Sequence, residues 1–276
     1  PVSKPLIQFT LEKLFKNQRI GDIVIVGHQM LLEQRLRDYL SQQVTPYTIV
    51  NQNSRIPAEI IKRFHIRTRK VKHNSIAGNM MKGYAASAAC EKRCHALFVA
   101  SDSPLTSEKL IDYFLDVAKT YAGDCTIILP AVLVEGTVDK FGRYPLRIIN
   151  DSDFQLSAKT DGYGRQGFRL SSLMYADPHG FDINTANTAY NLRKCLNPNV
   201  QLKLFKITRY LGYKNVYSKH FIKKDLSVKE VENITSAFFG GRLKIIPVTD
   251  AESSYDYDGT DDEYRRLAEL LKTSQS

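Results

Sequence analysis

The stretch that decides the fold is "LFVASDSPLTSEKLIDYFL", which runs from Leu97 to Leu115. An apolar run ends at Asp102, and a proline with several hydroxyl residues then leads into an amphipathic helical pattern. The apolar run predicts a buried strand, and Thr106 or Ser107 is a natural N-cap for the following helix. A strand that leads directly into a helix is the repeating unit of α/β folds with a mainly parallel sheet.

The same alternation continues on both sides of this stretch. Helical periods cover residues 5–17, 30–43 and 77–94. Apolar, strand-like runs cover residues 22–28, 47–52, 124–135 and 243–250. Pro130 interrupts one of these runs, which predicts a strand near a sheet edge or a bulge. We therefore expect a layered α/β fold with a mainly parallel central sheet.

Composition allows one large folded unit. The chain has 276 residues and 43% hydrophobic content, enough to bury a sizeable core. We expect a single domain over residues 1–276, with a mainly helical accessory region at about 184–240. No run approaches the ~20 apolar residues of a membrane helix, and no signal-peptide pattern is present, so we expect a cytoplasmic protein. The formal charge of +10 favours an anionic partner such as a phosphorylated substrate, nucleic acid or a membrane surface.

Asp102 stands where the predicted strand ends. Ligands of open α/β sheets bind outside the carboxyl ends of the strands, and a carboxylate there is a suitable ligand for Mg²⁺ beside phosphates. The alternative is that Asp102 caps the helix that follows, since a carboxylate also stabilises free N–H groups at a helix N-terminus. The local sequence leaves both readings open.

A second acidic cluster, "DYDGTDDEY", begins at Asp256. Asp256 and Asp258 lie two residues apart, so in an extended segment both carboxylates project to the same side. An EF-hand loop is excluded because the glycine comes fourth and the twelfth residue is Leu267. Two roles can hold at once: Asp261 or Asp262 caps the C-terminal helix, while Asp256 or Asp258 faces a metal ion.

Four segments, in this order, resemble the nucleotidyltransferases with a molybdenum-cofactor-guanylyltransferase-like domain. They are "SKPLIQFTLEKL" from Ser3, "HNSIAGNMMKGYAAS" from His73, "SDSPLT" from Ser101 and "DYDGTDDEYRRL" from Asp256. The resemblance implies a three-layer, Rossmann-like (GT-A-like) nucleotidyltransferase fold. It also implies a glycine-rich triphosphate loop, which would lie directly before Pro1 and outside this sequence.

The resemblance further implies a Mg²⁺-dependent transfer of a nucleotide from a nucleoside triphosphate to a phosphorylated acceptor, with release of pyrophosphate. Lys4 and Asp102 are the implied catalytic residues. The implied nucleotide contacts are Lys4, Ala77, Gly78, Asn79 and Ser101. The implied Mg²⁺ ligands are Asp102, Asp256 and Asp258. The candidate acceptor contacts are Lys140, Arg143, Arg165 and Arg169.

Simpler roles exist for several of these residues. Asn79 has amide donors and an acceptor for a base edge, but it also suits a helix N-cap. Lys4 and the basic acceptor candidates also suit solvated surface positions. For the transferase we expect no membrane partner and no nucleic-acid partner. One alternative function is a non-catalytic homologue that binds phosphorylated ligands or nucleic acid. The other is a nucleotide-sugar glycosyltransferase, although those enzymes carry their paired aspartates in mid-domain.

Overall fold

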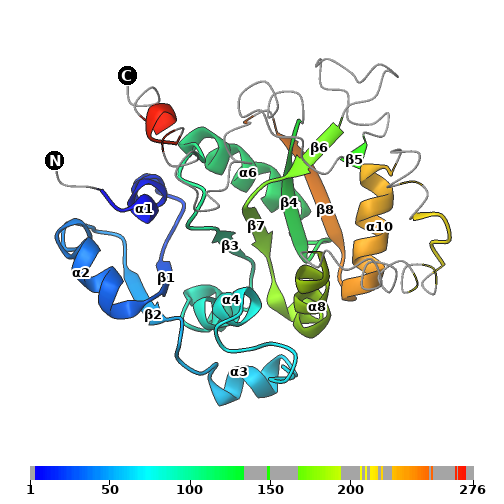
Figure 1. The fold of residues 1–276 in the computed structure, drawn as a ribbon, viewed down its shortest axis with the longest axis horizontal. Helices are drawn as coiled ribbons and strands as arrows, with labels where there is room; N and C mark the ends of the chain where they lie inside the picture. Colours follow the sequence, from blue (N-terminus) through cyan, green and yellow to red (C-terminus); the bar gives the residue numbers. More distant parts are fainter. Residues whose placement is uncertain are drawn as a thin grey trace.

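The computed structural model describes residues 4–133, 148–149, 167–193, 206, 209, 212–216, 219, 226–248, 250, 265 and 267–271. Within these ranges helices and strands alternate through the first half of the chain (Figure 1). The helices are α1 (Leu6–Lys16), α2 (Gln29–Leu40), α3 (Ala58–Arg63), α4 (Ile76–Ala85), α5 (Ala88–Lys92), α6 (Glu108–Tyr121), α8 (Ile183–Arg193) and α10 (Val228–Phe239), with the short 3₁₀ helix η1 (Pro178–Gly180). The strands are β1 (Ile23–Gly27), β2 (Tyr47–Asn51), β3 (Ala96–Val99), β4 (Ile127–Leu133), β5 (Ile148–Ile149), β6 (Gly167–Leu170), β7 (Leu173–Ala176) and β8 (Leu243–Val248).

The strands form two sheets. β1 and β2 pair in parallel, and the larger sheet has the order β3-β7-β4-β6-β5 with β8 beside β4. β4 and β8 are parallel, whereas β7 is antiparallel to both β3 and β4. β3, β4 and β8 therefore run in the same direction, and their carboxyl ends meet at one edge. The expected α/β class with parallel segments is confirmed. Residues 167–178 read as strand from their apolar pattern and form β6 and β7, but the antiparallel direction of these two strands was not predicted.

Alternation along β4 builds two cores, one on each face of the larger sheet. Ile128 and Val132 pack with Phe114 of α6 on one face. Ile127 and Ala131 pack with Val228 of α10 on the other face. Because successive strand residues point to opposite faces, this apolar run has to be covered by helices on both sides. The result is a three-layer arrangement, and α6 and α10 lie on opposite sides of the larger sheet (Figure 1).

The prediction of an edge position for Pro130 is wrong, because β4 pairs with β8 on one side and with β7 and β6 on the other. The Ile127 N–H donates to Arg242 O on the β8 side at 3.1 Å. N–H directions alternate along a strand, so the Pro130 nitrogen faces the other side. On that side β4 pairs first with β7 and then with β6. Ser171, in the bend between these two strands, donates its N–H to Pro130 O at 2.9 Å. A central proline is tolerated because it stands at this interruption of the ladder.

A further core joins the two sheets. Ile23 and Ile25 of β1 pack with Ile111 and Leu115 of α6, and Leu97 of β3 borders the same cluster. The described strands show no pairing between β1 and β3, although both contribute to this core. The small sheet is therefore attached to the larger one by side-chain packing.

The predicted helix over residues 77–94 divides into α4 and α5, and Arg93 ends α5 in a left-handed conformation with φ 50°. In the predicted accessory region the structure describes α8 and α10 together with isolated residues between them. Its status as a separate region stays a prediction, as does the single domain. Among the described residues, no helix is long and apolar enough to span a membrane.

Candidate active site

The turn after β3 exposes the residue on which the sequence analysis centred. Ser101 and Asp102 form an exposed turn directly beyond the strand, whereas the segment from Ser103 to Thr106 is buried. Ser107 is the N-cap of α6, and its Oγ accepts a hydrogen bond from Leu110 N–H at 3.1 Å. The capping alternative for Asp102 is therefore wrong. Its carboxylate is left in solvent at the carboxyl edge of the sheet.

Two residues that the sequence analysis missed hold this turn in place. Lys13 of α1 donates from Nζ to Pro104 O at 2.6 Å, and Ser107 Oγ donates to the Asp250 carboxylate. Burial lowers the pKa of Lys13, and the nearby carboxylates of Asp250 and Glu108 oppose that shift. A signal for Asp250 was present, since it follows β8 much as Asp102 follows β3. β3 and β8 run in the same direction, so both residues follow strands at the same edge of the larger sheet.

The predicted nucleotide segment forms the first turn of α4. Ser75 is the N-cap: its Oγ accepts from Gly78 N–H at 3.1 Å and donates to Lys72 O at 2.7 Å. A Cβ at Gly78 would lie 2.3 Å from Lys72 O and 2.7 Å from His73 O. Since real Cβ atoms do not approach oxygens so closely, only glycine permits this contact between the helix and the preceding turn.

Asn79 lies one residue beyond that glycine. The N-cap role considered for it is wrong, because Ser75 occupies the cap. Asn79 Oδ1 is buried and has no hydrogen-bond partner among the described residues. An unpaired buried amide oxygen is unfavourable by about 1–3 kcal/mol, so a donor supplied by a base edge or by a water molecule would stabilise it.

Lys82, on the same helix, fixes the loop that follows β2. It is 2% exposed, and Nζ donates to Asn51 O and Ser54 O at 3.3 Å each and also to Gln52 O. Burial lowers its pKa. The sequence analysis missed this role, although a single charge within the apolar run "AGNMMKGYAAS" was a usable signal.

The two parts of the candidate site lie at the same edge of the fold. α4 begins beyond the carboxyl end of β2, and the chain returns at Ala88, whose N–H donates to Asp22 just before β1 at 3.0 Å. β3 starts a few residues later. β1 and β3 thus begin at one end, and the first turn of α4 and Asp102 both lie at the opposite, carboxyl end.

The side chain of Lys4 is held by residues of α1, the helix that follows it. Its ammonium forms an ion pair with Glu12 and lies 4.0 Å from the centroid of the Phe9 ring. The side chain is 27% exposed, so it is not freely solvated. No contact among the described residues directs it toward the turn at Asp102. A phosphate contact from Lys4 requires the ammonium to leave or share Glu12.

The side chains of the remaining predicted site residues are not described by the structure. Asp256 and Asp258 fall outside the described residues, as do Lys140, Arg143 and Arg165. Arg169 belongs to β6, where it is in register with Val132, and its side chain is not described. The metal and acceptor assignments that rest on these residues stay predictions.

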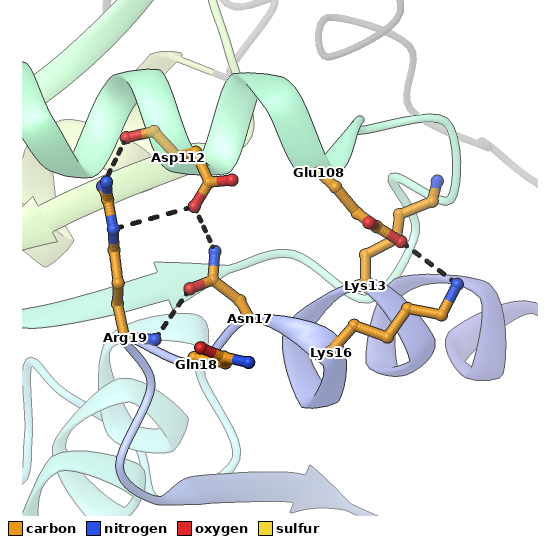
Figure 2. Close-up of a pocket in the computed structure, with 7 residues that line it drawn as sticks. All are labelled: Lys13, Lys16, Asn17, Gln18, Arg19, Glu108 and Asp112. Carbon is orange, nitrogen blue, oxygen red and sulfur yellow. Dashed lines mark hydrogen bonds and ion pairs between the residues drawn. The ribbon is translucent and has the colours of Figure 1, made fainter.

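A polar pocket of about 340 Å³ lies between the end of α1 and α6 (Figure 2). The side chains that line it from α1 pair with those from α6. Asn17 Nδ2 donates to Asp112 Oδ1 at 2.8 Å, and Lys16 Nζ lies 3.4 Å from Glu108 Oε1. None of the predicted site residues lines it. We assign it a structural role, because both of its carboxylates already pair with its own cations, Lys16 with Glu108 and Arg19 with Asp112.

No family model matches the chain, and no curated protein matches its sequence. Solved structures do match. A hypothetical transferase from Thermus thermophilus aligns with a TM-score of 0.58 and 16% identity, over 94% of this chain and 86% of that one. A CMP:2-keto-3-deoxy-manno-octonic acid synthetase complexed with CTP aligns with a TM-score of 0.51 and 7% identity, over 98% and 90%. A 4-diphosphocytidyl-2C-methyl-D-erythritol synthase from Anaerococcus prevotii gives 0.48 and 12%, over 96% and 86%.

The chain therefore shares the Rossmann-like α/β fold of the first two of these structures. The expected α/β class and the expected three-layer arrangement, with helices on both faces of the sheet, are confirmed by the structure together with this likeness. The narrower resemblance to the molybdenum-cofactor-guanylyltransferase-like group stays a prediction.

Proposed function

We propose that this protein is a cytoplasmic nucleotidyltransferase that couples a nucleoside triphosphate to a phosphorylated acceptor and releases pyrophosphate. The observation that carries the proposal is the exposed Asp102 carboxylate at the carboxyl end of β3, freed from capping by Ser107. The fold shared with two nucleotide-using or transferase structures supports the same conclusion. Fold alone does not select the chemistry, so the argument rests on this edge of the sheet.

The residues present suit Mg²⁺ at this edge. Asp102 offers hard carboxylate oxygens in solvent, and Mg²⁺ is commonly bound by one or two carboxylates together with substrate phosphates and water. The described residues contain no cluster of three or more metal-ligating side chains, so Asp256 and Asp258 are the proposed further ligands. When bound, the ion would neutralise negative charge on the phosphates.

The reaction needs positioning more than a protein nucleophile. An acceptor phosphate oxygen forms a bond to the α-phosphorus while the bond from that phosphorus to the pyrophosphate oxygen breaks. In this proposal Ala77, Gly78 and Asn79 hold the base at the start of α4, and Ser101 lies beside the phosphates. Lys4 contributes positive charge to the phosphates as they separate, and Lys140, Arg143, Arg165 and Arg169 bind the acceptor.

The test is thermal stabilisation of the protein by each of the four nucleoside triphosphates, with and without Mg²⁺. A ligand that binds only the folded state raises the unfolding temperature. We expect a Mg²⁺-dependent increase for one nucleotide, lost in Asp102→Asn. Asp124→Asn is the matched control, because Asp124 is an exposed aspartate in the turn before β4, at the opposite end of the strands.

Two results would contradict the proposal. One is the absence of stabilisation by any nucleotide, which would favour the non-catalytic alternative. The other is equal loss of the shift in Asp102→Asn and Asp124→Asn, which would mean that overall charge, and not this carboxylate, governs binding. Stabilisation by a nucleotide-sugar, without stabilisation by any triphosphate, would favour the glycosyltransferase alternative.

A further inference from the structure

The connection between α3 and α4 carries a basic surface that the proposed transferase does not use. No Asp or Glu occurs between residues 60 and 90. The Lys and Arg residues in that interval are Lys62, Arg63, Arg67, Arg69, Lys70, Lys72 and Lys82. We define the basic turn as residues 67–70, in which Arg67, Arg69 and Lys70 are exposed and form no ion pair with another described residue.

Buried side chains from α8 fix the backbone of the basic turn. Asn184 Oδ1 accepts from Arg67 N–H at 2.6 Å, and Asn184 Nδ2 donates to His65 O at 3.1 Å. Asn187 Nδ2 donates to Lys70 O at 2.9 Å. The two asparagines are 5% and 3% exposed, respectively. Both ends of the turn are thus tied to a helix that is distant in the sequence.

Apolar anchors complete this attachment. Ile66 and Val71, which flank the basic turn, are 5% and 0% exposed. Within the turn, Lys70 N–H and Val71 N–H both donate to Arg67 O, at 2.7 Å and 2.9 Å. A loop clamped in this way has lost its backbone entropy on folding, so binding would have to order only the exposed side chains of its cations.

Although no nucleic-acid partner is expected for the transferase from its sequence, we propose that the basic turn is a contact site for the phosphate backbone of a nucleic acid. Cations at exposed positions along a turn suit an extended polyanion, whereas a small anion requires donors that converge in a concave site. Lys62 and Lys72 extend the charge on either side, and both are exposed. A membrane surface is less suitable, because the turn itself offers no apolar side chain for insertion.

The residues of the basic turn, Arg67, Arg69 and Lys70, are not among those proposed to bind nucleotide, although Lys72 O, two residues beyond the turn, contacts the start of α4 at Ser75 and Gly78. α8 follows β7 and η1, and β7 runs opposite to β3, so α8 begins at the edge away from Asp102. The contacts of Asn184 therefore place the start of the basic turn near that opposite edge. Failure of nucleotide binding and failure of nucleic-acid binding can accordingly be observed independently.

The experiment measures fluorescence anisotropy of labelled mixed-sequence oligonucleotides at several salt concentrations. Its arms are single-stranded and duplex RNA and DNA, and a parallel co-sedimentation with anionic phospholipid vesicles tests a membrane as the source of the phosphates. The variant is Arg67→Gln/Arg69→Gln/Lys70→Gln, and the control is Arg35→Gln/Arg37→Gln/Lys109→Gln. The control removes the same charge from exposed positions of α2 and α6. Circular dichroism verifies that both fold.

For a single strand, each phosphate contact contributes about 0.7 to the slope of log K against log salt. Three lost contacts should lower the slope by about 2 and weaken binding about 100-fold near 0.1 M salt. Arg69→Gln alone, which removes one contact, should weaken it about 5-fold. The control should bind like the wild type.

Three results would overturn the proposal. They are no salt-dependent binding by the wild type, equal losses in the variant and the control, and binding to anionic phospholipid vesicles without binding to any oligonucleotide.

Discussion

Replacing Gly78 by alanine tests how the first turn of α4 is built. The new Cβ would lie 2.3 Å from Lys72 O and 2.7 Å from His73 O, and both oxygens belong to the backbone. Relief requires the turn to move away, which also disturbs the Ser75 cap at the same helix end. Gly83→Ala is the matched control, because a Cβ there meets only Val26 Cγ2 at 3.1 Å, the end of a side chain that can shift.

The expected magnitude follows from these contacts. Overpacking costs about 1–3 kcal/mol, and a lost N-cap costs about 1 kcal/mol. The higher helix propensity of alanine offsets about 1 kcal/mol of this. Gly78→Ala should therefore lower the free energy of unfolding by about 2 kcal/mol, roughly a thirtyfold change in the unfolding equilibrium. Gly83→Ala gains the same propensity without the backbone clash, so it should be close to neutral.

Urea denaturation followed by circular dichroism measures both variants under the same conditions. If the denaturation slope is unchanged, the midpoints report stability directly. Equal stability of the two variants, or a more stable Gly78→Ala, would refute the close packing of α4 against Lys72 and His73. If the packing is correct, Gly78→Ala should also weaken nucleotide binding, because Ala77 and Asn79 belong to the same turn.

Two other substitutions test buried polar contacts. Lys82→Met should destabilise the protein by about 1–3 kcal/mol, because three loop carbonyls lose their donor. Since burial lowers the pKa of Lys82, the folded state loses its proton before the unfolded state does. The stability of the wild type relative to Lys82→Met should therefore rise as the pH increases from the folded-state pKa toward 10.5. If urea titrations show the same stability difference between the two proteins at every pH, the burial of this ammonium is contradicted. Asn184→Ala should cost about 2–4 kcal/mol, since Arg67 N–H and His65 O both lose their partner, and faster hydrogen exchange at Arg67 would locate the effect.

Local patterns were sufficient for the elements on either side of Asp102. The apolar run before Asp102 and the amphipathic period after it predicted β3 and α6, and Ser107 is one of the two caps that the sequence offered. These predictions succeeded because a strand or helix is selected by the spacing of apolar residues and by hydrogen bonds within a few positions. The exposed place of Asp102 at the strand end follows from the same local order.

Pairing between distant segments was decided only by the tertiary structure. The sequence did not show that Pro130 belongs to a central strand, since that depends on β6, β7 and β8 all meeting β4. The lone charge in an apolar run marked Lys82, but the partners of Lys13 and Lys82 were hidden, because their acceptors are carbonyls at Pro104, at the end of β2 and in the loop after it. A carbonyl has no side-chain signature, so long-range contacts of this kind leave no pattern in the sequence, whereas the periodicity of a buried face does.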